Sequence, residues 1–135
     1  MSERIIEVVG ALVTDGEGRF LVGQRAAGKS QGGKWEFVGG KIEAGETPFR
    51  ALARECREEL GLEIENERMV DSVVHSYPDK TIRLSLVSCS PKPGSVPRAL
   101  EHQQIRWVAP SEMRELDFSA ADAELIERLS KVIRA

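Results

Sequence analysis

Three glutamates are spaced so that a single helix would gather their carboxylates. Glu55, Glu58 and Glu59 stand at i, i+3 and i+4, positions that share one side of an α-helix. Like charges at i,i+4 destabilise an isolated helix by about 0.2–0.5 kcal/mol unless a cation neutralises them. Mg²⁺ prefers oxygen ligands, is held by few carboxylates, and takes its other ligands from water and substrate phosphates. The spacing therefore predicts half of a magnesium site, which a polyphosphate would complete.

The same glutamates have a second interpretation, an ordinary solvated helix face on which neighbouring arginines neutralise them. Arg50, Arg54 and Arg57 are placed for such pairing. The surrounding pattern favours the metal site, because GKIEAGE (40–46) is followed after seven residues by RECREELGL (54–62). Matched context of this kind makes a motif more specific.

Residues 40–62 resemble the Nudix box in every polar position. The preceding stretch GKWEFVGGKIE (33–43) resembles MutT-type nucleoside triphosphate pyrophosphohydrolases, as do EHQQIRW (101–107) and FSAAD (118–122), more weakly. Glu101 followed by His and Gln, together with Ala121 and Asp122, is most similar to the CTP pyrophosphohydrolase branch. Two positions depart from the family: Cys56 replaces an aliphatic residue, and Val38 stands where many MutT-type chains have Pro.

The resemblance implies a metal centre. Glu55, Glu58, Glu59 and the Gly39 carbonyl would bind Mg²⁺, with Mn²⁺ as a substitute, and Glu101 would join them from a loop. The alternative for Glu101 is a surface carboxylate. The reaction would be attack of a metal-activated water on the polyphosphate, giving a nucleoside monophosphate and pyrophosphate. One of the glutamates would also act as the base.

The resemblance also implies contacts to the substrate. Arg54 would orient Glu46, and Lys41, directly after the glycine pair, would contact a phosphate. Arg25, at a strand end, would reach the phosphate or sugar, and Gly39 would also contact the substrate. Simple solvation is the alternative for both Lys41 and Arg25.

Asp122 stands where MutT-type enzymes place an Asn or Asp that hydrogen-bonds the base. A carboxylate accepts from amino groups such as the cytosine amine and donates only when protonated, which favours cytidine over an oxopurine. Ser119, three residues earlier, offers the alternative that Asp122 merely caps a helix. Phe37 and Val38 would line the base pocket, or else belong to the core.

The elements that must position these residues follow from local patterns. Thr47 as N-cap, Pro48 and Gly61 bound a helix over 47–60. Ser119 opens a final helix. We expect one apolar face on the first helix, opposite the three glutamates and formed by Phe49, Leu52, Ala53, Cys56 and Leu60. Metal binding and packing would thus use opposite faces of that helix. On the last helix we expect an apolar face formed by Leu125, Ile126, Leu129 and Ile133.

Strands are predicted at 5–14, 19–24, 35–38, 69–77, 81–90 and 104–108. The turn at 15–18 would join the first two in a β-hairpin, and the glycine pair 39–40 would end the third. This order predicts an α/β (α+β) chain in which a mixed sheet is sandwiched between helices, as the Nudix resemblance also implies.

Composition restricts the classes of function. We expect one domain over 1–135, and the net charge of −3 without a basic block argues against polymeric nucleic acid. Cys56 and Cys89 are expected as reduced core thiols. The start of the sequence lacks the apolar core of a signal peptide and no apolar run suits a membrane helix, so we expect a cytoplasmic protein, monomeric or homodimeric.

The leading hypothesis is thus a pyrimidine-preferring nucleoside triphosphate pyrophosphohydrolase acting on small nucleotides. Three alternatives stay open: an 8-oxo-dGTP diphosphatase, a hydrolase of ADP-ribose or dinucleoside polyphosphates, and a nucleotide-sensing module without catalysis. The intact glutamates argue against the sensing module.

Overall fold

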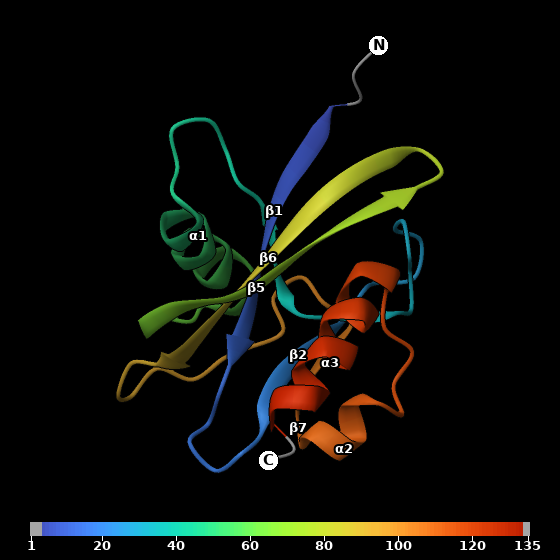
Figure 1. Cartoon of the computed structure of the whole chain (residues 1–135). Helices are drawn as coiled ribbons and strands as arrows, with labels where there is room; N and C mark the ends of the chain where they lie inside the picture. Colours follow the sequence, from blue (N-terminus) through green and yellow to red (C-terminus); the bar gives the residue numbers. More distant parts are fainter. Residues whose placement is uncertain (1–3, 134–135) are drawn as a thin grey trace.

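The computed structural model describes residues 4–133, and their side chains as far as Leu129 (Figure 1). Three helices and two β-sheets make up this part of the chain. In chain order the elements are β1 Ile5–Val13, β2 Phe20–Gln24, β3 Trp35–Glu36, β4 Val38–Lys41, α1 Pro48–Leu60, β5 Ile64–Tyr77, β6 Lys80–Pro91, β7 Gln104–Val108, α2 Pro110–Met113 and α3 Ala120–Ile133.

The larger sheet has four strands in the order β4-β1-β6-β5, with β1 and β6 parallel and the other pairs antiparallel. The smaller sheet, β3-β2-β7, is antiparallel. Figure 1 shows α1 on one side of the larger sheet and α3 on the other. The predicted mixed sheet between helices is therefore confirmed, and the second sheet is an addition to it.

Two apolar clusters hold these layers together. The cluster under α1 includes Leu52, Cys56 and Leu60 with Val9 and Val87 of the larger sheet, all without exposed surface. Burying side chains of this size contributes about 1.5–3 kcal/mol each. The other cluster lies under α3 and the smaller sheet and contains, among others, Val22, Trp35, Phe37, Leu84, Leu86, Val108, Phe118 and Leu125.

Helix α1 begins and ends where the sequence predicts. The Thr47 hydroxyl accepts from the Arg50 N–H at 3.1 Å, and Gly61 terminates the helix in the left-handed region at φ 60°. Leu52, Cys56 and Leu60 are buried as expected, but Phe49 is 39% exposed, and Ala51 and Glu59 are buried as well. The stripe facing the sheet therefore includes one of the three glutamates.

The predicted hairpin at the start of the chain is wrong. β1 pairs with β4 on one side and β6 on the other, so no edge of β1 is left for β2. Only one antiparallel bridge, Thr14 to Phe20, joins the two segments before β2 enters the smaller sheet.

The predicted strand at 35–38 is two strands in different sheets. Trp35 and Glu36 pair with β2, whereas β4 begins at Val38 and pairs with β1. The glycine pair does not end a strand, because Gly39 and Gly40 lie inside β4 and face Gly10 and Val9. Phe37, between the strands, is where the chain passes from one sheet to the other.

The remaining differences are small. β5 begins five residues before the predicted start, at Ile64, and the short helix α2 has no counterpart in the prediction. Leu125, Ile126 and Leu129 are buried as expected, whereas the Ile133 side chain and the first three residues lie outside the described part.

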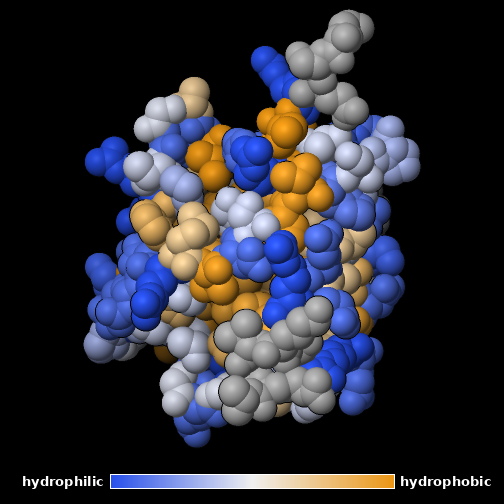
Figure 2. Space-filling view, in the orientation of Figure 1, coloured by the Kyte–Doolittle hydropathy of each residue, from blue (hydrophilic) through white to orange (hydrophobic). Residues whose placement is uncertain are grey.

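Apolar surface crosses the middle of the face in Figure 2 and is bordered by charged residues. Met69, Val70 and Val74 of β5 are among the exposed large apolar side chains. Among residues 4–133, no helix is long and apolar enough to cross a membrane.

Candidate active site

The glycine pair allows β4 to lie unusually close to its neighbours. A Cβ added at Gly39 would lie 1.9 Å from the Val9 carbonyl oxygen. A Cβ at Gly40 would lie 2.4 Å from Oε2 of Glu55. Both distances are far below van der Waals contact, so any side chain at these positions would displace β1 or Glu55. The glycines thus bring the β4 backbone against a carboxylate of α1.

Arg54 holds the start of this arrangement. Its Nε and second guanidinium nitrogen donate to the two carboxylate oxygens of Glu46 at 2.8 and 2.9 Å, which confirms the expected pairing. A further nitrogen donates to Glu55 at 3.0 Å, and another bond reaches the Lys41 carbonyl oxygen at 3.0 Å. The Arg54 side-chain hydrogen bonds lower the pKa of Glu46 to about 2. The Arg54 guanidinium therefore links the loop before α1, the helix and β4.

The three spaced glutamates occupy different environments. Glu59 is buried, and burial followed by contact with Glu55 raises the pKa of its carboxyl above the usual range. Glu58 is 53% exposed and lies 3.4 Å from Arg54. Metal binding and helix packing were expected to use opposite faces of α1, and for Glu59 that expectation is wrong. Glu55 and Glu59 converge, while Glu58 stands at the rim.

Two residues without a predicted role complete the buried cluster. Nε2 of His102 lies 2.9 Å from Oε2 of Glu36 and 3.7 Å from Oε1 of Glu59. One ligand atom from each of these three residues falls within 4.8 Å of the others. A charged residue inside the apolar segment WEFV (35–38) was a signal that could have identified Glu36. Nothing local identifies His102, which is 66 residues away from Glu36 in sequence.

Glu101 precedes His102 and is exposed. It lines a cavity of about 130 Å³ together with Glu59, His102, Gly39 and Arg25. The structure therefore places Glu101, from the loop before β7, beside the same cavity as Glu59.

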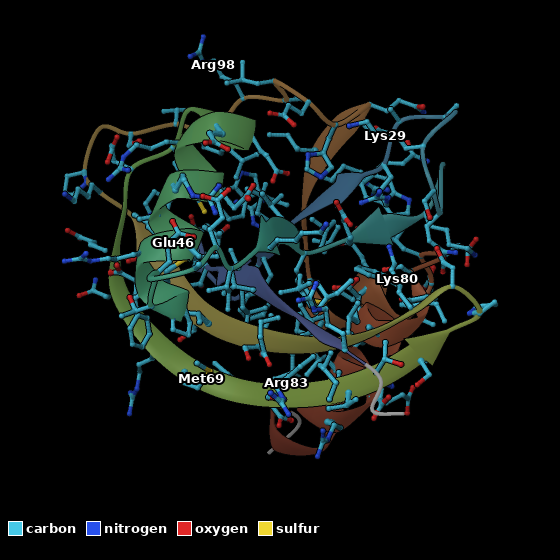
Figure 3. All side chains as sticks on the ribbon, turned by 90° about the horizontal axis from the view of Figure 1, so that it is seen from above. Lys29, Glu46, Met69, Lys80, Arg83 and Arg98 are labelled. Carbon is cyan, nitrogen blue, oxygen red and sulfur yellow. The ribbon has the colours of Figure 1, made fainter. Side chains whose placement is uncertain are left out.

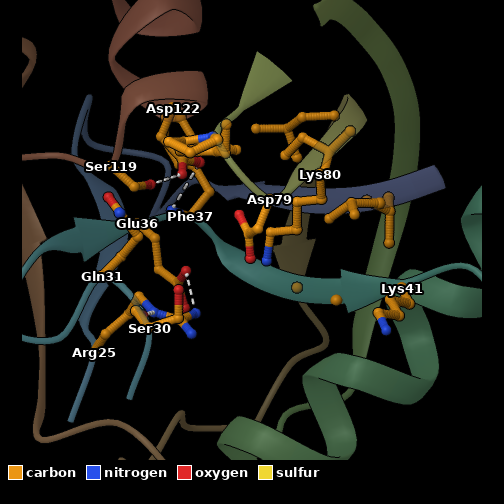
Figure 4. A pocket seen from close by; sticks show the side chains of 18 residues that line it. Arg25, Ser30, Gln31, Glu36, Phe37, Lys41, Asp79, Lys80, Ser119 and Asp122 are labelled. Carbon is orange, nitrogen blue, oxygen red and sulfur yellow. Dashed lines mark hydrogen bonds and ion pairs between the residues drawn. The ribbon is translucent and has the colours of Figure 1, made fainter. Parts of the chain in front are cut away.

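A larger cavity of about 240 Å³ adjoins this cluster, and Gly39, Arg25 and Glu36 line both. Figure 4 shows Asp122 and Phe37 at one end of it and Lys41 at the other. Seen from above, Glu46 lies beside α1, and Lys80, which also lines the cavity, lies across the molecule from it (Figure 3).

The two residues expected to line the base pocket, Phe37 and Val38, differ in their surroundings. Phe37 lines the larger cavity and packs on Phe118, with ring centroids 5.8 Å apart. Val38 was expected to line the same pocket, but it has no exposed surface and belongs to the cluster under α1. Successive residues of an extended segment point to opposite sides, so only one of the pair can face the cavity.

Arg25 is engaged rather than free. Its guanidinium donates to Oε1 of Glu36 at 3.0 Å and to the Ser30 carbonyl oxygen at 2.7 Å. It is therefore fixed between the two cavities by Glu36. Lys41 is exposed at the end of the larger one, in a position to meet an anionic group.

Asp122 is buried at the far end of the larger cavity. Its carboxylate accepts from the Ser119 hydroxyl and, at 3.5 Å, from the Phe37 N–H (Figure 4). Burial raises the pKa of Asp122 to about 7. The Ser119 N–H donates to the Trp35 carbonyl oxygen at 3.0 Å, so the reciprocal bond of a capping box is not formed. Asp122 contacts the helix start and still faces the cavity.

Known proteins resemble this chain over most of its length. The family model of the NUDIX domain matches residues 5–129. The CTP pyrophosphohydrolase of Escherichia coli is 37% identical over 124 residues, covering 92% of this chain and 90% of that protein. The 8-oxo-dGTP diphosphatase of Haemophilus influenzae is 33% identical over 129 residues, covering 96% and 94%.

A solved structure has the same fold. The MutT protein from Methanosarcina mazei aligns with a TM-score of 0.87 over 100% of this chain and 99% of that one, at 23% identity. The two sequence relatives are named for different bases, cytosine and an oxidised guanine.

Proposed function

Because the chain belongs to the Nudix family and is a Nudix hydrolase, we propose that it is a Mg²⁺-dependent nucleoside triphosphate pyrophosphohydrolase. It would release a nucleoside monophosphate and pyrophosphate. The observation that carries the proposal is the contact between Glu55 and the buried Glu59 beside the glycine pair, where both cavities meet.

The donor set fits Mg²⁺. Glu55, Glu59 and, from the loop, Glu101 offer hard carboxylate oxygens, which this ion prefers. A carboxylate as buried as Glu59 is unfavourable in its ionised form unless a cation lies nearby. His102 offers a nitrogen, which suits transition metals better than Mg²⁺, so we place it outside the ligand set. Glu58, at the rim, would complete the ligands with the Gly39 carbonyl.

Bound Mg²⁺ would polarise the phosphate and lower the pKa of a coordinated water, which supplies the nucleophile. The chain's own residues do the positioning. Arg54 fixes Glu46 and Glu55, so the carboxylates are preorganised before substrate arrives. Lys41, exposed at the end of the cavity, would bind phosphate oxygens, and Arg25 would face the phosphate or sugar between the cavities.

Base choice would rest on Asp122. With a pKa of about 7, its carboxyl is present near neutral pH in both forms. The neutral acid has one donor and one acceptor, which match N3 and the N4 amine of cytosine. Phe37 would supply an apolar wall for the base. A cytidine triphosphate is therefore our first substrate.

An oxidised guanine nucleotide is the second candidate. The ionised carboxylate was expected from the sequence to favour cytosine, but cytosine offers it only one donor, the N4 amine, whereas the ionised form of Asp122 has two acceptors. These match the N1–H and N2 amine of a guanine ring. The Haemophilus influenzae relative, named for 8-oxo-dGTP, supports this candidate.

The test is pyrophosphate release from CTP, dCTP, dGTP, 8-oxo-dGTP and ADP-ribose at pH 7. We expect a cytidine triphosphate to have the highest kcat/KM. If 8-oxo-dGTP ranks first, the second candidate is correct. AMP formed from ADP-ribose without comparable pyrophosphate release from any triphosphate would contradict the proposal.

A further inference from the structure

We infer that His102 is a positioning residue that packs the Glu101 loop on Gly23 and holds the carboxylates of Glu36 and Glu59 beside one ring nitrogen, Nε2. The inference rests on the proposed function, since it assigns His102 a role in arranging the metal-binding carboxylates. His102 itself would contact neither metal nor substrate.

The imidazole ring of His102 packs directly on the backbone of Gly23. Gly23 lies in β2, paired with Glu36 of β3 on one side and Ile105 of β7 on the other. A Cβ at Gly23 would come within 2.6 Å of Cδ2 and 2.9 Å of Nε2 of His102. Gly23 is not among the glycines with positive φ, so its backbone conformation does not require glycine. The absent side chain is therefore explained by the ring above it.

The loop that carries Glu101 is fixed on both sides of that residue. The Leu100 N–H donates to the Glu59 carbonyl oxygen at 3.2 Å, and the Gln103 N–H donates to the Gln24 carbonyl oxygen at 2.9 Å. His102, with a side chain only 4% exposed, is the one residue of 98–104 that is not exposed. Glu101 thus lies between a contact to α1 and a ring buried on β2.

One nitrogen of the ring, Nε2, also lies beside two carboxylates. Arg25 holds Oε1 of Glu36, and His102 lies beside Oε2 of the same group. The same nitrogen, Nε2, lies 3.7 Å from Oε1 of Glu59. The side chains of Arg25, Glu36, His102 and Glu59 therefore form a continuous chain from the larger cavity to the carboxylate cluster.

Packing alone does not explain a histidine at this position. Within the described residues, Nδ1 of His102 is buried without a hydrogen-bond partner. An unpartnered buried nitrogen is unfavourable, and an apolar residue would fill the space over Gly23 without that cost. The contact of Nε2 with Glu36 is the feature that an apolar residue could not provide.

The direct test is Mn²⁺ affinity in the absence of nucleotide, measured by calorimetry, together with kcat and KM for the best triphosphate. In His102→Ala we expect Mn²⁺ to bind about 10- to 100-fold more weakly and kcat to fall by a similar factor, as for other residues that orient metal ligands. KM for the nucleotide should change by less than about threefold, because His102 is not placed at the base or sugar.

Three further variants separate positioning from general damage. Gly23→Ala should weaken Mn²⁺ binding by displacing the ring, and adding it to His102→Ala should cause no further loss. His102→Gln, which keeps a side-chain N–H for Glu36, should recover part of the affinity. Gln103→Ala is the matched control on the same loop. It removes an exposed side-chain bond to Gln24 and should leave Mn²⁺ affinity unchanged.

Normal Mn²⁺ affinity and kcat in His102→Ala and Gly23→Ala would overturn the inference while leaving the proposed function intact. If His102→Ala does not fold, His102→Gln and Gly23→Ala carry the same test. A wild-type protein that binds no Mn²⁺ and cleaves no triphosphate would instead overturn the proposed function, so the two failures are distinguishable.

Discussion

Gly40 lies directly against Glu55, so close that a methyl group on Gly40 would come within 2.4 Å of a carboxylate oxygen. This contact joins β4 to α1 at the point where the carboxylates of the proposed metal site converge. Gly39, one residue earlier, is packed instead against the Val9 carbonyl oxygen. The missing side chain therefore has a different role at each glycine. At Gly40 it allows the contact with Glu55, and at Gly39 it allows β4 to pack on β1, whereas the proposed part of Gly39 in the site is its backbone carbonyl.

Alanine substitutions should separate these roles. Gly40→Ala meets a side chain that can move, so we expect a folded protein whose kcat is about 10- to 100-fold lower. In Gly39→Ala the added methyl group meets the backbone of β1, which cannot move aside. We therefore expect the free energy of unfolding to fall by about 3 kcal/mol or more. Urea unfolding and steady-state kinetics of both variants measure this. Equal losses of stability would contradict the separation.

Glu59 and Glu58 should respond differently to neutralisation. Both Glu59→Gln and Glu58→Gln should lose most turnover. Only Glu59→Gln should gain stability without metal, because it removes a buried carboxyl. Added Mg²⁺ should raise the melting temperature of the wild type and not that of Glu59→Gln. If Mg²⁺ raised the melting temperatures of the wild type and of Glu59→Gln equally, the metal would have to bind elsewhere.

The ion pair between Arg54 and Glu46 should stabilise the folded protein at neutral pH, and this stabilisation should be lost in acid. The folded pKa of Glu46 is about 2 against an ordinary 4.5, so its contribution is complete above pH 4.5 and lost as pH falls through 2. Thermal melts of wild type and Glu46→Gln at pH 7, 5 and 3 should therefore converge as pH falls. A constant difference across this range would show that the carboxylate charge is not involved.

Asp122 should have the opposite pH dependence. Its folded pKa of about 7 lies above the ordinary 3.8, so the folded protein retains a proton and loses stability as pH rises through this interval. The stability of Asp122→Asn relative to wild type should increase by about 2–3 kcal/mol from pH 5 to pH 8. Parallel pH profiles of the two proteins would contradict this.

The same titration should alter base preference. As pH rises through 7, the wild-type ratio of kcat/KM for CTP over 8-oxo-dGTP should fall, because the neutral acid is lost. Asp122→Asn keeps a donor and an acceptor at every pH, so its ratio should stay constant. A wild-type ratio that does not change with pH would exclude Asp122 from base recognition.

Local signals in the sequence predicted the parts of the site that local structure builds. The caps of α1 at Thr47 and Gly61 and the pairing of Arg54 with Glu46 depend on residues within one motif. Sheet assignment depends on long-range partners, and for that reason the hairpin between β1 and β2 was predicted wrongly. Val38 was misassigned because a single residue of register decides whether an extended segment faces the cavity or the core.

The buried cluster shows the same limit. Glu36 and His102 meet only because β3 and the loop before β7 flank β2 on opposite sides. No spacing rule connects residues that far apart in the chain. The burial of Glu59 depends likewise on how α1 is rotated on the sheet, which the pattern of apolar residues on the helix located only approximately.

The most direct test of the central claim is the identity of the products formed from CTP with and without Mg²⁺. The carboxylate cluster predicts equal amounts of CMP and pyrophosphate, formed only when Mg²⁺ is present and almost abolished in Glu59→Gln. Release of CDP and phosphate, or turnover that persists after the metal is removed by chelation, would contradict it.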